Sequence, residues 1–318
     1  MYTQETVISA PSHLQDMFVR LDPGLTAKQQ YEKHGNQLAE MYEDKKLLYI
    51  DNYPFEFDRE LMWSLPIIGP KEIPHSLLKM KIGGAMAPIT KPFNDQTHIL
   101  GNFVKPAEKA YAMQAMIKSI QQQLQQIARD MFPMYKPIEE DRGFSIRLTC
   151  QAGEEIHFDS YAGMDDSNHR VRIFANLDCR PRIWSTGGLF ENWIDKFDDA
   201  LIAKGVVHHP NKANEFLNEK IDWDKYGDLA YMMFAPLSVW FVDSQPVSHE
   251  IVYGRRMASQ TTVVDPATVL HPEKMFHVTA KELWRKEYQK RAAALGPTKL
   301  AQLIKEDKLK EAAAVKLK

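Results

Sequence analysis

The sequence contains little cysteine: Cys150 and Cys179 are the only two among 318 residues. Two cysteines exclude a disulfide scaffold and a zinc site built from cysteine pairs, so we expect a protein of the reducing cytoplasm. No apolar run approaches the ~20 residues that span a bilayer, and the first residues lack the basic and apolar segments of a secretory signal. A formal net charge of -2 argues against the concentrated basic surface that binds nucleic acid.

The N-terminal third has mainly helical patterns. Thr26 and Gln29 have the spacing of a capping box and precede a polar helical run, and residues 105–131 have the periodicity of a long helix. Between these segments, KLLYIDNYPF is typical of a strand that ends at Asn and Pro. We therefore expect residues 20–135 to form a largely helical support.

The middle of the chain, roughly residues 140–270, is rich in short β patterns. The segments FSIRLTC, EIHFDSY, RVRIFANLD, LSVWFVDS and SQTTVVD contain many β-branched and aromatic residues and are separated by turn residues. Short strands at this spacing predict an antiparallel sandwich or barrel. Residues 190–228 interrupt the pattern and predict a helical or irregular insertion.

The C-terminal tail, residues 279–318, is predicted to be helical. Thr279 and Glu282 have capping-box spacing, Gly296 breaks the first helix, and a Lys-rich helix follows. Helices that flank one central β unit favour a single domain over residues 1–318, with an all-β core and an α+β fold overall. The Lys-rich helix leaves peripheral membrane contact open, although a solvated surface is the simpler interpretation.

His157 and Asp159 are the first candidate metal ligands. On a strand, residues i and i+2 point to the same face, so both side chains could reach one ion. An imidazole and a carboxylate are two of the three ligands in the facial triad of iron(II) oxygenases, which leaves coordination positions open. Alone, a His-x-Asp triplet is close to a chance event and fits equally well a hydrogen-bonded pair on a half-buried strand.

His249 supplies the expected third ligand. It follows the strand pattern LSVWFVDS and a turn, 92 residues after His157. In a β barrel of this kind, such a late strand could return the chain to the first two ligands, and the insertion accounts for the long gap.

Arg172 is the candidate anchor for a cosubstrate. It lies 15 residues after His157 on a strand where Arg172 and Asn176 share one face. A guanidinium inside a barrel needs an anion, and arginine binds carboxylates in a two-pronged geometry. Many 2-oxoglutarate oxygenases place an arginine about where Gln260 stands, 11 residues after His249. The glutamine there makes an anchor at Arg172 more necessary.

Other residues could line a pocket. Asn176, Trp240 and Gln260 are candidates beside the cosubstrate, and Trp184 is a candidate beside the substrate, although most such aromatic residues belong to cores. Arg147 and Arg182 could bind an acidic substrate or form structural ion pairs. The adjacent pair His208 and His209 would point to opposite faces of a strand, which argues against a metal site.

The segments HFDSYAGMDDSNHRVRIFANLDCRPRIWSTGGLFE and LSVWFVDSQPVSHEIVYGRRMASQTTVV carry a resemblance to a known family. They resemble the iron(II)- and 2-oxoglutarate-dependent hydroxylases that act on 3-deoxy-D-manno-oct-2-ulosonic acid (Kdo) in bacterial lipopolysaccharide. The resemblance covers about a third of the chain. It implies a double-stranded β-helix (jelly-roll or cupin-like) core, iron(II) ligated by His157, Asp159 and His249, and the cosubstrates 2-oxoglutarate and O2.

The expected activity is hydroxylation of a C–H bond in a small, polar and acidic substrate, of the Kdo type by resemblance. Because Asp159 fills the position that related halogenases leave for halide, hydroxylation or desaturation is favoured over halogenation. Three alternatives stay open. They are an oxygenase acting on an amino acid or natural-product intermediate, a cupin-like metal enzyme that uses His169 as an extra ligand, and a non-catalytic cupin-like metal-binding protein.

Overall fold

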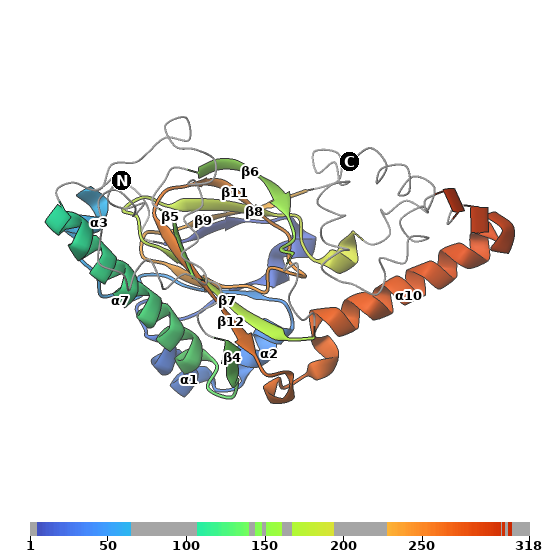
Figure 1. Cartoon of the computed structure of the whole chain (residues 1–318), viewed down its shortest axis with the longest axis horizontal. Coiled ribbons are helices and arrows are strands. Elements are labelled where there is room, and N and C mark those ends of the chain that lie inside the picture. Colours follow the sequence, from blue (N-terminus) through green and yellow to red (C-terminus); the bar gives the residue numbers. More distant parts are fainter. Residues whose placement is uncertain are drawn as a thin grey trace.

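In the computed structural model, strands from all parts of the chain assemble into two sheets. The structure describes residues 5–64, 107–139, 144–147, 151–160, 167–193, 228–299, 301–302 and 305–306. Figure 1 shows the two sheets stacked at the centre, with helices against the lower sheet and one long helix that reaches away from both. The fold is therefore mixed α+β, as the sequence predicted.

The upper sheet has five strands in the order β1-β9-β8-β11-β6. Its strands are β1 (Val7–Ser9), β6 (Gln151–His157), β8 (Arg182–Thr186), β9 (Ala230–Phe234) and β11 (His249–Gly254). The insertion leaves and re-enters this sheet at neighbouring positions, because Thr186 at the end of β8 pairs with Ala230 at the start of β9. Residues 194–227 of the predicted insertion lie outside the described residues.

The lower sheet has seven strands, in the order β2-β3-β10-β7-β12-β4 with β5 also paired to β12. They are β2 (Phe18–Arg20), β3 (Leu47–Ile50), β4 (Pro137–Glu139), β5 (Ser145–Arg147), β7 (His169–Asn176), β10 (Val239–Phe241) and β12 (Met257–Val264). From β5 to β12 the chain crosses between the sheets at every step except β8 to β9. All pairings among β5 to β12 are antiparallel, as predicted, whereas β2 and β3 pair in parallel.

The described helices are α1 (Ala27–His34), α2 (Gln37–Glu43), α3 (Arg59–Ser64), α7 (Ala107–Met131) and α10 (Phe276–Leu295), with short 3-10 turns. The predicted capping box at the start of α1 is confirmed, since the Thr26 and Gln29 side chains each bond to the other's backbone N–H. The predicted run after Thr26 divides into α1 and α2 because Gly35 takes a positive φ of 56°.

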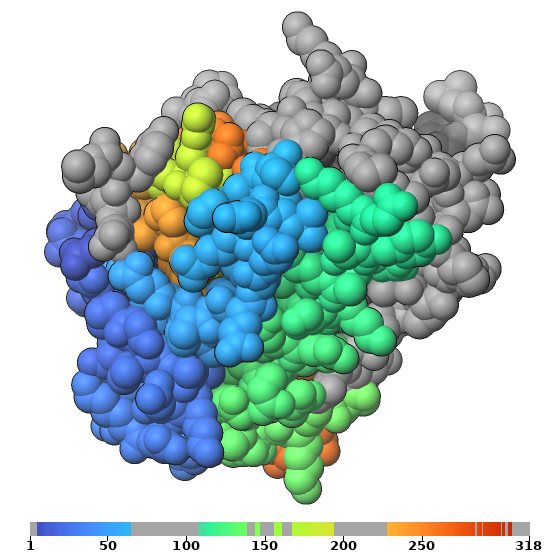
Figure 2. Space-filling model, turned by 90° about the vertical axis from the view of Figure 1, so that its left-hand side faces the viewer, coloured from blue at the N-terminus to red at the C-terminus, as the bar shows by residue number. Residues whose placement is uncertain are grey.

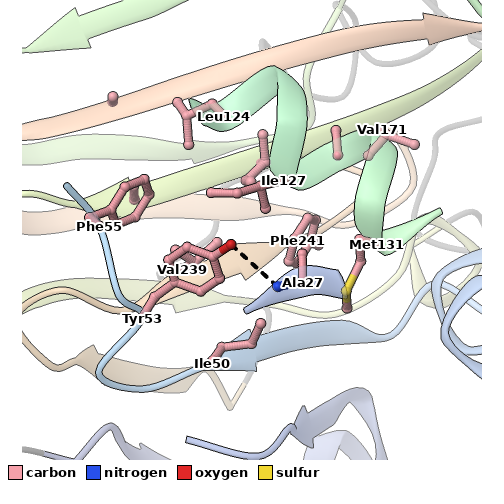
Figure 3. Close-up of a cluster of buried hydrophobic side chains, with 14 of the residues drawn as sticks. Ala27, Ile50, Tyr53, Phe55, Leu124, Ile127, Met131, Val171, Val239 and Phe241 are labelled. Carbon is pink, nitrogen blue, oxygen red and sulfur yellow. Dashed lines mark hydrogen bonds between the residues drawn. The ribbon is translucent and has the colours of Figure 1, made fainter. Parts of the chain in front are cut away.

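The residue alternation in β7 and its neighbours separates two buried clusters. Val171, Ile173 and Ala175 pack toward α7, whereas Phe174 faces the upper sheet. Figure 3 shows the outer cluster, where Tyr53 accepts a hydrogen bond from the Ala27 backbone N–H at 3.3 Å. In Figure 2 the N-terminal elements (blue) and α7 (green) form one continuous face over this cluster. The inner cluster, between the sheets, includes Phe174, Trp184, Phe234 and Trp240.

Some boundaries differ from the expectations. The strand predicted in KLLYIDNYPF is present as β3, and the predicted strands of the middle region are present too, but the N-terminal part also contributes the unpredicted strands β1 and β2. The last helix begins at Phe276, so Thr279 lies inside it and bonds back to the Met275 and Phe276 carbonyls instead of capping it. The predicted break at Gly296 is confirmed by its positive φ of 75°. Among the described helices, none combines the length and the apolar character needed to cross a bilayer.

Glu43, at the end of α2, connects distant parts of the chain. Its buried carboxylate accepts hydrogen bonds from the Tyr135 hydroxyl at 2.6 Å and from the backbone N–H groups of Leu270 at 2.9 Å and His271 at 2.7 Å. A buried carboxylate is tolerated only when its acceptor sites are filled in this way. One side chain thus joins the N-terminal third, the end of α7 and the segment before α10.

We predict that Glu43→Ala lowers the free energy of unfolding by about 3 kcal/mol or more, because one buried and two partly buried donors lose their acceptor. Tyr135→Phe should cost about 1 kcal/mol, since it removes one of these bonds. Urea denaturation followed by circular dichroism measures both. Glu40→Ala, on the exposed side of the same helix, is the matched control and should change stability little. An equal effect of both glutamate substitutions would contradict this role.

His169 is part of the core. It is the first residue of β7, and its ring meets the edges of Tyr42 at 5.7 Å and Tyr135 at 5.4 Å between centroids. Burial lowers the pKa of His169 to about 4. His169 packs between two tyrosines, and it is not one of the candidate metal ligands found among the described residues.

The depressed pKa of His169 predicts a defined pH dependence. Between about pH 6.5 and pH 4 the unfolded chain binds a proton that the folded chain does not, so His169 lowers stability as the pH falls. His169→Phe, which keeps the ring packing, should therefore gain up to about 3 kcal/mol relative to the wild type across this window. Urea denaturation at several pH values measures the difference. A constant offset between the two proteins would show that His169 does not titrate in this way.

Candidate metal centre

The pairing of β6 with β11 brings the two candidate histidines together. His157 is the last residue of β6, His249 is the first residue of β11, and the two are directly opposed in the antiparallel register. Their ring centroids are 4.5 Å apart. A bulge follows between His249 and Ile251, so this pair sits at the end of the regular ladder.

Asp159 lies just beyond the end of β6, and the expectation that one strand carries both His157 and Asp159 was wrong in this respect. A long-range hydrogen bond, instead of strand pairing, positions the Asp159 backbone: its N–H donates to the Ser244 carbonyl at 2.8 Å. The carboxylate still turns toward the histidines. Its Oδ1 atom is 3.8 Å from His157 Nε2 and 3.9 Å from His249 Nε2.

The other carboxylate oxygen, Asp159 Oδ2, has two polar partners. The Ser244 hydroxyl donates to it at 2.5 Å, and the Arg172 guanidinium forms an ion pair with it. Arg172 Nη1 also donates to Ser244 Oγ at 3.0 Å. Since all three side chains are largely buried, these contacts compensate the charge of the carboxylate in a poorly hydrated place.

His249 is held from the other side by the inner cluster and by a polar loop. Trp184 stacks on its ring at 5.2 Å between centroids with an interplanar angle of 21°. The preceding residue, Ser248, accepts a hydrogen bond from the Gly187 N–H at 3.0 Å, and its carbonyl accepts one from the Thr186 hydroxyl at 2.5 Å. Both bonds come from the end of β8, which therefore fixes the start of β11.

These contacts create a group of ligand atoms that could hold one metal ion. One atom from each of His157, Asp159 and His249 lies within 4.8 Å of the other two. At metal–ligand bonds of roughly 2.1 Å, ligand atoms at right angles lie about 3 Å apart, so a small inward movement would complete three adjacent positions. Two imidazoles and one carboxylate suit iron(II) and leave the opposite positions for other ligands. The donor set therefore fits the expected metal.

The four predicted cosubstrate residues have different positions. Arg172 lies at the metal centre. Asn176 is buried at the other end of β7, where its amide donates to the carbonyls of Arg180, Phe234 and Ala235. Those bonds indicate a structural role for Asn176, and it does not lie with Arg172 at the metal.

Gln260 and Trp240 are also separated from the metal centre. Gln260 pairs with Ile173, on the face of the lower sheet that packs against α7, whereas Thr261 pairs with Arg172 on the inner face. The alternation along the strand thus turns Gln260 away from the candidate ligands. Trp240 is buried in the inner cluster and stacks on Phe234 with ring centroids 4.0 Å apart. That packing agrees with a core aromatic residue.

The predicted substrate residues are also spread out. Trp184 contacts His249 directly. Arg182 is buried two residues before it, at the end of β8 far from Thr186, and its side chain lies over Gly254 so closely that a Cβ atom there would meet Arg182 Cγ at 2.8 Å. Arg147 pairs with Met257 through the backbone at the edge of β12. His208 and His209 lie outside the described residues.

Sequence reasoning missed the residues that hold the ligands, above all Ser244, Thr186 and Ser248. Each acts from a turn or from the end of a strand, and each finds its partner about 60 or more positions away along the chain. A serine in a turn carries no local pattern that indicates such a partner. The only available signal was the dense turn chemistry of DSQPVSH directly before His249.

Several solved structures resemble this one. The apo structure of the Kdo hydroxylase KdoO, described as a non-heme Fe(II) alphaketoglutarate dependent dioxygenase, gives a TM-score of 0.60 at 16% identity, over 84% of this chain and 95% of that chain. KdoO in complex with alphaketoglutarate and Fe(III) gives a TM-score of 0.59 at 14% identity, over 84% and 95% of the two chains. Its complex with succinate and Fe(III) gives 0.60 at 15%, over 84% and 96%. At these identities the likeness shows a shared fold.

The sequence itself gives the more specific match. None of the curated proteins is significantly similar in sequence. A family model described as 3-deoxy-D-manno-oct-2-ulosonic acid (Kdo) hydroxylase matches residues 26–213, a region that includes His157, Asp159 and Arg172. Because this match spans more than half of the sequence, the chain belongs to the Kdo hydroxylase family.

Proposed function

We propose that this protein is an iron(II)- and 2-oxoglutarate-dependent dioxygenase that hydroxylates a C–H bond of a Kdo-type sugar acid. The observation that carries the proposal is the convergence of His157, Asp159 and His249 within 4.8 Å in a chain of the Kdo hydroxylase family. Similar folds in KdoO are described with iron and alphaketoglutarate or succinate, which supports the same cofactors here.

Each residue of the centre has a distinct task in this proposal. His157, Asp159 and His249 hold the metal. When bound, iron(II) would allow O2 to oxidise two molecules together: one oxygen atom enters the C–H bond of the substrate, and the other enters 2-oxoglutarate, which becomes succinate and carbon dioxide. Trp184 and its neighbours keep the far side of His249 dry. The side chain of His157 is 30% exposed and that of His249 only 6%, so substrate would approach from the side of β6.

Arg172 is the proposed anchor of 2-oxoglutarate. It lies on the inner face of β7 beside Ser244, and its side chain retains 18% exposure. A guanidinium carries five N–H donors in a flat fork, so it can contact Asp159, Ser244 and the distal carboxylate of the cosubstrate together. Thr261 of β12 is paired with Arg172 of β7 and therefore borders the proposed cosubstrate site.

We also propose that the two sheets form a double-stranded β-helix within one domain. The alternation of β5 to β12 between the sheets supports this topology. The N-terminal strands β1 to β3 extend the edges of both sheets, which supports a single domain. Arg147 and Arg182 remain candidates for an acidic substrate. For Arg182, whose side chain is deeply buried, this role requires the substrate to reach far between the sheets.

The first prediction concerns the three proposed ligands. Anaerobically reconstituted wild-type protein should bind one iron(II) ion and release succinate when oxygen, 2-oxoglutarate and a Kdo-containing acceptor are added. Asp159→Ala should abolish both succinate release and hydroxylation, because the remaining two imidazoles do not define a facial site. His13→Ala, at an exposed histidine, is the control and should leave both unchanged. Tight iron binding by the wild type without succinate under any condition would contradict the cosubstrate assignment.

The second prediction separates the two roles of Arg172. Arg172→Ala should weaken 2-oxoglutarate binding by about 30-fold or more, as expected when one partner of a buried charged pair is truncated. Iron(II) affinity should change much less, since all three ligands remain. Calorimetric titration of each ligand measures the two effects, with Arg180→Ala, an exposed arginine beyond the end of β7, as the control. Equal losses of both affinities would show that Arg172 only positions Asp159 and does not bind 2-oxoglutarate.

A further inference from the structure

We propose that Ser244 is a positioning residue that makes Asp159 a ligand through one oxygen only. Ser244 lies in the loop between β10 and β11, 85 positions from Asp159 along the chain. Its hydroxyl contacts the carboxylate oxygen that faces away from the histidines. The inference rests on the proposed metal site, and it assigns to this site a residue outside the three ligands.

The direction of the hydrogen bonds follows from the chemistry of the three side chains. Arg172 can only donate, so Ser244 Oγ must accept from Arg172 Nη1 at 3.0 Å. An ionised Asp159 can only accept. The single proton of the serine hydroxyl is therefore directed to Asp159 Oδ2, at 2.5 Å. Ser244 thus has one arrangement that satisfies both neighbours, and this arrangement fixes the plane of the carboxylate.

The consequence for the metal is a restriction on the carboxylate. Asp159 Oδ2 is engaged by Ser244 and Arg172, while Oδ1 faces the two Nε2 atoms at 3.8 and 3.9 Å. A carboxylate that turned to bind through both oxygens would occupy an additional coordination position. The facial triad depends on keeping that position open for other ligands. Ser244 would therefore position Asp159 and also keep its second oxygen from occupying a coordination position of the metal.

The surrounding backbone allows the hydroxyl to be removed without moving the loop. The Asp159 N–H bonds to the Ser244 carbonyl, which any residue at this position retains. The Val247 N–H donates to the Asp243 carbonyl, and the Gln245 N–H donates to the Asp243 side chain, so the loop has its own internal support. Ser244→Ala therefore isolates the effect of one hydroxyl.

Ser238 offers a matched control. It lies directly before the same strand, β10, whereas Ser244 follows it, and both serines are buried. The Ser238 hydroxyl donates to the Ala235 carbonyl at 2.7 Å, away from the candidate ligands. Removing the Ser238 hydroxyl costs one hydrogen bond and removing the Ser244 hydroxyl costs two, but only Ser244 contacts a candidate metal ligand.

The experiment is a titration of the full-length protein with cobalt(II), whose visible absorption reports coordination number and geometry. Loss of a hydrogen-bonding partner of a ligand typically weakens metal binding by about 10- to 100-fold, and this is the expected change for Ser244→Ala. Its cobalt spectrum should also change in shape and intensity. Ser238→Ala should keep the wild-type affinity and spectrum, and Ser244→Thr, which retains a hydroxyl, should restore most of the affinity. Thermal unfolding of each metal-free variant checks that the fold is intact.

The outcomes separate this proposal from the function on which it rests. Absence of cobalt binding by the wild type would overturn the metal site itself. Normal wild-type binding together with an unchanged affinity and spectrum in Ser244→Ala would overturn only the positioning role. An equal spectral change in Ser238→Ala would also overturn it, because the effect would then follow from any lost hydroxyl near β10.

Discussion

The antiparallel register of β6 and β11 is the constraint on which the metal centre depends. It places His157 opposite His249, although the two residues are 92 positions apart in the sequence. A slip of one residue would turn one histidine to the opposite face of the sheet, and the pair would no longer converge. β6 ends the five-strand order, but β11 is held on its other side by β8, which pairs in turn with β9, so β11 could shift only by also breaking its ladder with β8.

The interior between the sheets divides into an apolar and a polar part. Aromatic rings of the inner cluster fill one part, where Trp240 lies between Phe174 and Phe234 in nearly parallel stacks with interplanar angles of 8° and 6°. Charged and hydroxyl groups occupy the other part, around Asp159. Trp184 stands at the border, since it contacts both the aromatic cluster and His249. Electrostatic interactions at the metal centre are consequently strong, because little water competes with them on one side.

The sequence predicted the parts of the site that follow from local periodicity. The strand patterns, the helix over residues 105–131 and the capping box at Thr26 depend on neighbours a few positions apart, and the structure agrees with them. The face shared by Arg172 and Phe174 follows from strand alternation in the same way. The candidate ligands could be predicted because the His-x-Asp triplet, a histidine after a late strand and Arg172 occur together; the triplet alone is close to a chance event.

What sequence could not predict depends on contacts between distant segments. The return of Ser244 to Asp159 requires the three-dimensional course of the β10–β11 loop, which no local pattern encodes. The inner or outer orientation of Gln260 requires the register of β12 against β7, and one residue of offset reverses it. The contribution of β1 and β2 to the sheets was also hidden, because short edge strands carry few residues with a clear preference.

The pairing of Thr186 with Ala230 has a consequence for how such a protein can diversify. The chain leaves the upper sheet after Thr186 and re-enters it at Ala230, on an adjacent strand, so both ends of the intervening segment are anchored at one point. The entropy of closing a loop rises only slowly with its length, about 0.6 kcal/mol for each doubling. Thr186 also bonds to the residue before His249, so this anchor point adjoins the candidate metal centre. Segments of different length and composition can therefore be exchanged between β8 and β9 at little cost to the sheet that carries His157 and His249.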